Sequence, residues 1–319
     1  MGAVSPGWIV VGGEALVDLV PGAGAAPGVL SPMTPLMGGG PFNVAVTLGR
    51  LGAPTRFLSR ISTDTFGEAL VERLRLSDVD VSMVQRGAEP TTLAVVGLAE
   101  DGSARYSFHV EGTADRLVAD PGPLPDDVRA LSLGTVSLLL EPGASAYEAM
   151  LRRESAAGRL VSLDPNVRAA LVPDAGAYRA RFRSWLPDVG LLKLSEEDAG
   201  WLAEGADPLA AVREWHGRGP AAVLLTRGAA GLAALTGAGD LVEVPARPVT
   251  VVDTIGAGDT VHGAVLAWLA EHDALSVDAV RALDADAWRE ALSFVADAAA
   301  VTCSRAGAEP PFAAELAAR

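Results

Sequence analysis

Short apolar runs alternate with amphipathic stretches along the second half of the chain. The runs include ALSLGTV, RLVSLD, VGLLKL and AAVLLT, and helix-patterned stretches at 144–156, 174–185 and 195–215 separate them. Such runs between amphipathic segments are typical of buried parallel strands joined by crossover helices. The pattern therefore predicts an α/β fold with a layered, mainly parallel sheet and right-handed connections.

The first 115 residues have a different pattern. Strand-like runs such as WIVVGGEALVDLV, TTLAVVGLAE and ARYSFHV follow one another or flank one βαβ unit at 43–84. We expect the partly amphipathic runs at about 14–36 and 90–112 to pair as a small sheet that forms a lid. Alanine-rich segments at 257–271 and 286–302 have helical apolar spacing and should pack on the main sheet. No proline-rich linker divides the chain, so we expect a single domain over 1–319.

Composition narrows the function classes. Half of the 319 residues are apolar and one fifth are charged, which predicts a soluble protein with a large core. A net charge of -15 disfavours binding to nucleic acid. No apolar run is long enough to span a membrane and no secretion signal begins the chain, so we expect a cytoplasmic protein. The single cysteine, Cys303, excludes an internal disulfide, and no Cys or His cluster has metal-site spacing.

The chain contains one lysine, Lys193, in the segment LLKLSEED. A Walker A loop needs a lysine after its last glycine, and a protein kinase needs one in its glycine-loop domain. No glycine-rich loop precedes Lys193. The sequence therefore excludes both of these phosphate-transfer mechanisms.

The strongest candidate site is the segment VVDTIGAGDTVHGAVLAWL at 251–269. A strand-like run leads into Gly256, Ala257 and Gly258, and Asp259 then opens an apolar helix. Glycines at a helix N-terminus let backbone amides bind an anion. A carboxylate beside that anion hole could take the proton of an attacking hydroxyl during phosphoryl transfer. The alternative interpretation is a tight turn whose aspartate only caps the helix.

A second glycine-rich segment lies at 37–70. It places Gly38, Gly39 and Asn43 at the start of an apolar-faced helix, followed by Leu51-Gly52 and the run ISTDTFG. The two segments together resemble the two signatures of the ribokinase-like (PfkB) carbohydrate kinase family. Their wording looks most like that of fructokinases and 2-keto-3-deoxygluconate kinases. The resemblance implies a three-layer sandwich with a mainly parallel central sheet and a small β-sheet lid.

The resemblance also implies roles for particular residues. It makes Asp259 the catalytic base, with the amides of 256–258 stabilising the transferred phosphate. It places the sugar near Asp18, Gly38, Gly39, Asn43, Arg105, Asn166 and Arg168, and the nucleotide near Thr226, Gly228, Gly231, Lys193 and Ser195. The alternatives from the residues alone are a surface aspartate at 18, an ion-paired arginine at 168, an ordinary alternating strand around 105 and a plain hairpin at 224–235.

Two metal sites follow from the same resemblance. The family's N-x-x-E segment, which helps to hold Mg²⁺, falls on Ser195 to Asp198, so serine replaces asparagine and Asp198 replaces the final glutamate. Carboxylates remain there for an oxygen-ligated Mg²⁺. Asp253 would support a monovalent cation such as K⁺, together with carbonyls near 304–307. The four histidines are interpreted as structural or surface residues, although His262 could line the nucleotide side.

The functional hypothesis is an ATP-dependent kinase that phosphorylates a hydroxyl of a ketose or a keto-sugar acid. A nucleoside kinase of the same family is a second hypothesis, which three tyrosines and seven phenylalanines disfavour because such a site needs aromatic residues. A third is a non-catalytic sugar-binding or regulatory protein, which predicts loss of the base or of the glycine loop. Lid strands of this family often pair between subunits, so a homodimer is also predicted.

Overall fold

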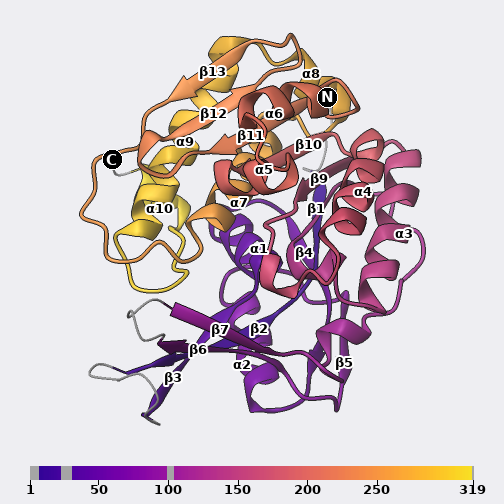
Figure 1. Cartoon of the computed structure of the whole chain (residues 1–319), viewed down its shortest axis with the longest axis vertical. Coiled ribbons are helices and arrows are strands. Elements are labelled where there is room, and N and C mark those ends of the chain that lie inside the picture. Colours follow the sequence, from indigo (N-terminus) through magenta and orange to yellow (C-terminus); the bar gives the residue numbers. More distant parts are fainter. Residues whose placement is uncertain (1–6, 23–30, 99–103, 318–319) are drawn as a thin grey trace, which may run out of the picture.

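A large sheet runs through the centre of the computed structural model, which describes residues 7–22, 31–98 and 104–317 (Figure 1). Within these ranges the strand order is β13-β12-β11-β10-β9-β8-β1-β4-β5. The strands are β1 (Trp8–Gly12), β4 (Thr55–Ser62), β5 (Val84–Gly87), β8 (Val128–Gly134), β9 (Leu160–Asp164), β10 (Leu191–Ser195), β11 (Ala222–Thr226), β12 (Leu232–Leu235) and β13 (Leu241–Val244).

The apolar runs of the sequence form the middle of this sheet. β9 reads LVSLD and is buried throughout, and β10 reads LLKLS with only its last residue partly exposed. Strands covered on both faces by helices are expected to be apolar along their length. All neighbouring pairs are parallel except those made by β12, which runs opposite to β11 and β13. The predicted mainly parallel sheet is therefore confirmed.

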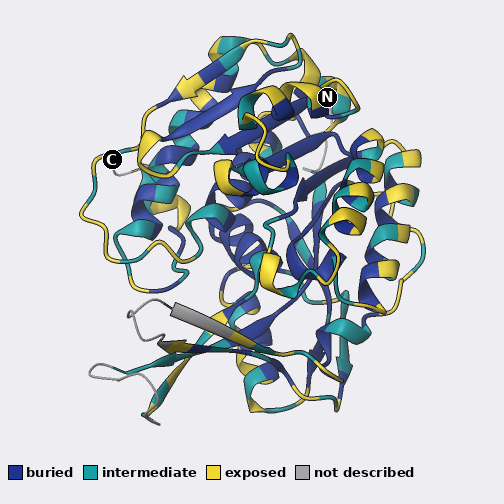
Figure 2. Ribbon diagram, in the orientation of Figure 1, coloured by how far each residue is buried: buried dark blue, intermediate teal, exposed yellow. Residues whose placement is uncertain are grey.

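Helices cover both faces of the sheet and complete three layers (Figure 2). One apolar cluster packs against α1 (Gly40–Arg50), α2 (Thr65–Arg75), α7 (Ala257–Glu271), α8 (Val277–Ala282) and α9 (Ala285–Cys303). The other packs against α3 (Gly143–Ala156), α4 (Ala175–Trp185), α5 (Glu196–Leu202) and α6 (Pro208–His216). A short α10 (Ala313–Ala317) follows. None of the helices in the described ranges is long and apolar enough to cross a bilayer.

The segment 195–215, expected as one helical stretch, forms two helices. Glu204 and Gly205 have φ values of 58° and 82°, which end α5 in the left-handed region. Asp207 then caps α6 by accepting a hydrogen bond from the Ala210 amide, and Pro208 occupies the first turn. The expectation missed these stop and start signals.

A separate sheet of order β3-β2-β6-β7 lies below the large one in Figure 1. Its strands are β2 (Leu16–Pro21), β3 (Met33–Gly38), β6 (Thr92–Leu98) and β7 (Ala104–His109). β2 pairs antiparallel with β3 and parallel with β6, and β6 pairs antiparallel with β7. This small sheet arises from the two segments expected to form the lid. Its closure over a site stays a prediction.

Candidate active site

Asp259 is the third residue of α7 and is only 8% exposed. Its Oδ2 accepts a hydrogen bond of 2.8 Å from Nδ2 of Asn43 on α1. Burial raises the pKa of Asp259 to about 6, while the Asn43 hydrogen bond and the charge of Lys193 act in the opposite direction. Asp259 therefore does not cap its own helix. It is a buried, oriented carboxylate whose proton affinity suits a general base near neutral pH.

The glycine turn before Asp259 has the geometry of a candidate anion-binding site. Gly256 has a φ of 75°, and a Cβ there would lie 2.5 Å from Cβ of Ala308. Glycine is thus required at this position by both conformation and space. The amides of Gly258 and Asp259 lie in the first turn of α7, where a helix supplies no acceptor. These amides and the helix dipole favour a phosphate beside Asp259.

Asp18 faces the same region from the small sheet. A Cβ on Gly38 would lie 2.2 Å from Oδ2 of Asp18, so the glycine makes room for the carboxylate. Partial burial raises the pKa of Asp18 to about 6, and Arg168 lowers it. Gly39 has a φ of 107° and allows the chain to turn from β3 into α1.

The loop after β9 completes this side of the site. Asn166 has a φ of 37°, and its amide donates to Oδ1 of Asp164 at 3.1 Å. Arg168 is exposed and donates to Oδ1 of Asn166 at 2.7 Å. A Cβ on Gly40 would lie 3.4 Å from both Asn166 Nδ2 and Asp259 Oδ1. Residues from α1, α7 and the loop after β9 therefore meet at one point, and their role in binding a sugar stays a prediction.

Lys193 and Asp164 form a buried ion pair under the glycine turn. Lys193 Nζ lies 2.6 Å from Asp164 Oδ2, and each side chain is 4% exposed. A Cβ on Gly258 would lie 3.2 Å from the same Nζ. The lysine expected to bind nucleotide is thus held inside the protein. It supplies a fixed positive charge next to the candidate anion hole.

Ser195 and Asp198 bond to each other at the start of α5. The Ser195 hydroxyl donates to Oδ2 of Asp198 at 2.7 Å and accepts from the Asp198 amide at 2.9 Å. Oδ1 of Asp198 accepts from the Val167 amide at 2.9 Å. Burial, and then the nearby Asp164, raises the pKa of Asp198. The segment that departs from the family pattern therefore anchors the loop after β9.

Asp253 joins the glycine turn to the C-terminal segment. Its carboxylate accepts from the amides of Ile255 and Gly307, at 3.0 and 2.9 Å. Asp253 and Asp198 do not meet in one site. No group of three or more His, Cys, Asp or Glu side chains in the described parts of the chain could hold a metal ion.

The remaining predicted residues lie in the β11–β12 hairpin and in the small sheet. Thr226 ends β11 and is partly buried, residues 228–230 form the exposed turn of the β11–β12 hairpin, and Gly231 is buried, where a Cβ would lie 2.2 Å from the Val244 carbonyl oxygen. Gly228 has a φ of 53°. The backbone of Arg105 pairs with Gly97 in the small sheet, but its side chain is outside the described residues.

A small cavity lies behind the base. Gly40, Thr135, Asp164, Asp259 and His262 contribute to its lining, and its volume of about 10 Å³ is that of one water.

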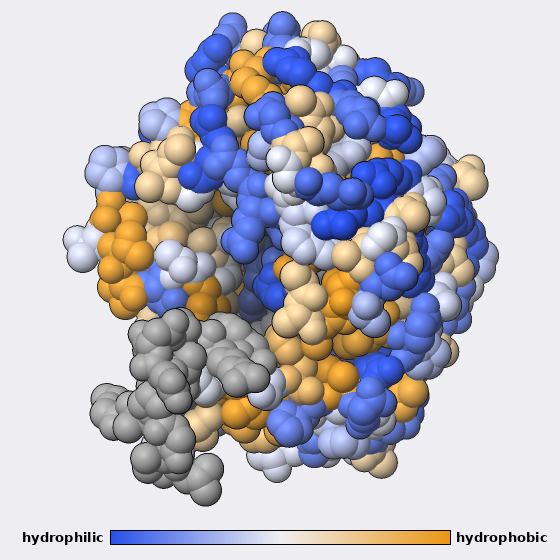
Figure 3. Space-filling model, in the orientation of Figure 1, coloured by the Kyte–Doolittle hydropathy of each residue, from blue (hydrophilic) through white to orange (hydrophobic). Residues whose placement is uncertain are grey.

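The His262 ring nitrogen Nε2 lies 2.7 Å from the Ser162 hydroxyl. Burial lowers the pKa of His262 to about 3, so the ring is neutral. His262 is therefore an interior residue. Figure 3 shows a recess with hydrophilic atoms at its floor on the face shared with Figure 1.

Comparison with known proteins decides the family. The model of the pfkB family carbohydrate kinases matches residues 9–314. This chain belongs to that family. Among curated relatives, a fructokinase from Rhizobium leguminosarum bv. trifolii is 40% identical over 279 residues, which cover 87% of this chain and 84% of the relative. A fructokinase from Klebsiella pneumoniae is 34% identical over 270 residues, covering 83% and 84%.

Solved structures agree with this assignment. A Xylella fastidiosa fructokinase with bound ATP matches with a TM-score of 0.87 and 27% identity, over 98% of this chain and 97% of that one. A Vibrio cholerae fructokinase, solved with fructose, ADP and potassium ion, matches with a TM-score of 0.83 and 98% coverage of both chains. Its identity of 24% supports the fold alone. The protein is a ribokinase-like carbohydrate kinase.

Two buried carboxylates near the candidate site, Asp164 and Glu14, were not predicted from the sequence. Asp164 ends an apolar strand, and Glu14 follows another; such positions at the carboxyl edge of a parallel sheet were the available signal. Asp164 lies two positions before Asn166, but no role was predicted for it. Both carboxylates are buried and hydrogen-bonded.

Proposed function

We propose that this carbohydrate kinase transfers the γ-phosphate of ATP to a hydroxyl of fructose or of a closely related ketose. The observation that carries the proposal is the buried Asp259 carboxylate, oriented by Asn43 and placed beside the amides of the glycine turn. The relatives named fructokinase, at 40% and 34% identity, favour a ketose over other sugars.

In the proposed reaction the sugar lies between Asp18 and Asp259. The hydroxyl oxygen attacks the γ-phosphorus, its proton passes to the Asp259 carboxylate, and the bond from the γ-phosphorus to the β–γ bridging oxygen breaks. ADP leaves with that oxygen. The amides of 258 and 259 stabilise the charge on the transferred group, and Lys193 adds a positive charge behind them.

Mg²⁺ fits this site as an ion carried mainly by the nucleotide. Both oxygens of Asp198 already accept hydrogen bonds, and no ligand cluster occurs in the described ranges. Mg²⁺ commonly keeps several waters and binds through phosphates with one or two carboxylates. Such an ion would neutralise the β- and γ-phosphate oxygens during transfer. Asp198 is the residue proposed to hold it through water.

Other assignments continue as proposals. Asp253, bonded to the Gly307 amide, and the carbonyls of 304–307 are proposed to hold a monovalent cation such as K⁺. The turn of Thr226, Gly228 and Gly231 is proposed to border the nucleotide. A homodimer and a cytoplasmic location are proposed as well.

A keto-sugar acid is the second candidate substrate. Burial raises the pKa of both Asp18 and Asp259, and the exposed guanidinium of Arg168 lies close enough to both carboxyls to oppose that rise. A planar guanidinium at that position could bind a substrate carboxylate with two hydrogen bonds.

ADP release with ATP and Mg²⁺ tests the proposal across fructose, tagatose, ribose, 2-keto-3-deoxygluconate, inosine and adenosine. We expect the highest kcat/KM with fructose or tagatose. A maximum with 2-keto-3-deoxygluconate that is lost in Arg168→Met would select the acid instead. Turnover with a nucleoside alone would contradict both candidates.

A further inference from the structure

The chain passes between the two sheets four times within the described ranges. The segments are 13–15 from β1 into β2, residue 39 from β3 into α1, 88–91 from β5 into β6, and 110–114 after β7. A movement of the small sheet relative to the site must bend these four segments. Whatever holds them therefore sets the position of Asp18 relative to Asp259.

Glu14 holds the first two segments. It is 5% exposed, although it lies in a connection between sheets. Its carboxylate accepts hydrogen bonds from the Gly40 amide at 3.1 Å and from the hydroxyls of Thr135 and Ser137. The Glu14 amide donates to the Ser137 hydroxyl at 2.7 Å. The Gly40 amide can only donate, and the two hydroxyls can do so as well; burial raises the pKa of Glu14, while the hydrogen bonds from Ser137 and Thr135 lower it.

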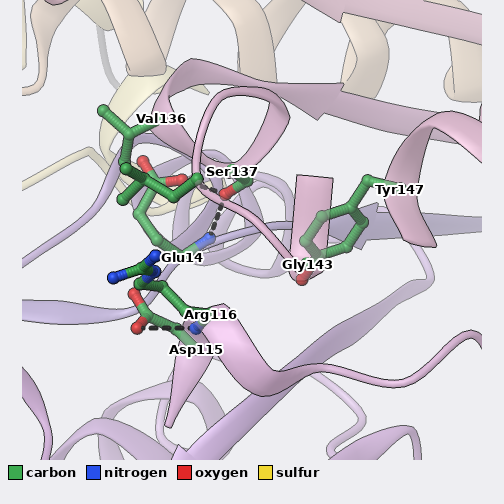
Figure 4. Close-up of a pocket in the computed structure, with 8 residues that line it drawn as sticks. Glu14, Asp115, Arg116, Val136, Ser137, Gly143 and Tyr147 are labelled. Carbon is green, nitrogen blue, oxygen red and sulfur yellow. Dashed lines mark hydrogen bonds between the residues drawn. The ribbon is translucent and has the colours of Figure 1, made fainter. Parts of the chain in front are cut away.

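Asp115 lies where the other two segments meet the small sheet, while within 88–91 itself Asp64 accepts hydrogen bonds from the Thr91 amide and hydroxyl, at 2.9 and 2.7 Å. Asp115 is 8% exposed and accepts hydrogen bonds from the hydroxyls of Thr92, at the start of β6, and Thr113, after β7. The Arg116 amide donates to it at 3.0 Å. Glu14 and Asp115 line one cavity, and Figure 4 shows Glu14 above Asp115, with the Arg116 side chain beside them.

Thr135 links Glu14 to the region of the proposed base, Asp259. Its φ is 60°, a left-handed conformation that is strained for a β-branched residue. Its hydroxyl bonds to Glu14, and its side chain lines the cavity behind Asp259. Gly40, the second partner, begins the helical turn that carries Asn43, which in turn orients Asp259. Glu14 is therefore bonded to both Thr135 and Gly40, the two residues that connect it to Asp259.

We propose that Glu14 and Asp115 form a hinge clamp, in which Glu14 is a positioning residue that aligns the catalytic base with the sugar held by the small sheet. Neither carboxylate needs to touch substrate. The clamp joins the first two connections through Glu14 and the ends of the last two, at Thr92 and Thr113, through Asp115, and it leaves the nucleotide side, on the loops after β10 and β11, unaffected. This inference rests on the proposed function for its kinetic consequence.

The variant Glu14→Gln tests the clamp. The glutamine side chain keeps the shape of the glutamate, but its NH₂ group replaces one acceptor oxygen with a donor that faces other donors. We expect kcat/KM for the sugar to fall about tenfold or more, the loss of a hydrogen bond to a charged group, while KM for ATP stays within about twofold. Asp115→Asn should do the same. Ser137→Ala removes one donor and serves as a milder variant if Glu14→Gln folds poorly.

Glu154→Gln is the matched control. Glu154 is a fully buried carboxylate on α3, paired with Arg153 and Arg159 and remote from the four segments. Its replacement should lower the unfolding midpoint without changing the ratio of the two KM values. The clamp would be overturned if Glu14→Gln impaired kcat/KM equally for the sugar and for ATP. It would also be overturned if Glu154→Gln caused the same kinetic change as Glu14→Gln.

Hydrogen–deuterium exchange without ligand separates the clamp from the proposed function. Peptides covering 13–18 and 38–43 should exchange faster in Glu14→Gln than in Glu154→Gln, whatever the substrate is. Wild-type protein without sugar-dependent turnover would refute the proposed function alone. Unchanged exchange in both peptides would refute the clamp alone.

Discussion

The side-chain amide of Asn43 donates a hydrogen bond of 2.8 Å to Asp259, across 216 positions of sequence. The bond joins the first turn of α1 to the first turn of α7, so each glycine-rich segment holds the other in place. The other carboxylate oxygen of Asp259, Oδ1, lies near Gly40, and so does Asn166 of the loop after β9. The two sequence signatures therefore meet at one place in the fold.

Replacing Asn43 by Ala should slow turnover and make the base less acidic. The hydrogen bond lowers the pKa of Asp259, so its loss should move the acid limb of kcat/KM to higher pH. We expect kcat at neutral pH to fall about tenfold, the value of one charge-assisted hydrogen bond. Steady-state kinetics from pH 5 to 9 measure both effects.

Thr47→Val is the control for that variant. Thr47 lies one turn further along α1 and donates to the Asn43 carbonyl oxygen at 2.8 Å without contacting Asp259. Its replacement should alter stability and leave the acid limb in place. A limb that moves equally in both variants would show that a change in the helix, rather than the hydrogen bond, is responsible.

The wild-type enzyme should lose activity as the pH falls through about 6. The base acts only when ionised, and burial raises the pKa of Asp259 to about 6, so protonation removes it well above the range of an ordinary aspartate. The kcat/KM profile is the appropriate measurement because it reports the ionisation of the free enzyme, the state to which this pKa belongs. Full activity maintained down to pH 4.5 would contradict the base assignment.

Lys193→Met should be among the most destabilising single changes. It leaves Asp164 buried without its counterion, which costs about 3–5 kcal/mol in the free energy of unfolding. Arg218→Met breaks an exposed pair with Glu214 and should cost less than about 1 kcal/mol. Urea denaturation compares the two, and similar losses would mean that the buried pair contributes no special stability.

The sequence was sufficient for the fold because the signals are local and strong. The apolar runs of β9 and β10 have the length and composition of buried strands, and the glycine turn before Asp259 needs a conformation that only glycine adopts readily. The helix expected over 257–271 is confirmed within its predicted bounds. Each of these features depends on neighbours in sequence.

The polar supports of the site depend instead on residues far apart. Nothing near Glu14 in sequence indicates its bonds to Thr135 and Ser137, more than 120 positions away. The ion pair of Lys193 with Asp164 likewise requires β9 and β10 to be neighbours in the sheet. Pairings of this kind follow from strand order, which composition and periodicity do not determine.

Gly256→Ala should impair both folding and turnover. A φ of 75° costs an alanine about 1 kcal/mol, and its Cβ would also displace Ala308. The start of α7 would shift with it. Gly200→Ala, inside α5 with no atom within 4 Å of the new Cβ, should instead stabilise by about 0.5–1 kcal/mol. Thermal unfolding and kcat, measured on both variants, distinguish a site-specific effect from a general one.

The most direct test of the account is sugar-dependent ADP release by Asp259→Asn beside the wild-type protein, with ATP binding measured by calorimetry on both. Asparagine keeps the shape of the side chain but cannot accept the proton. The account predicts that kcat falls by about 10²-fold or more, as for loss of a general base, while the affinity for ATP is retained. Turnover within about threefold of wild type, with ATP bound equally, would contradict the role of Asp259 as the catalytic base.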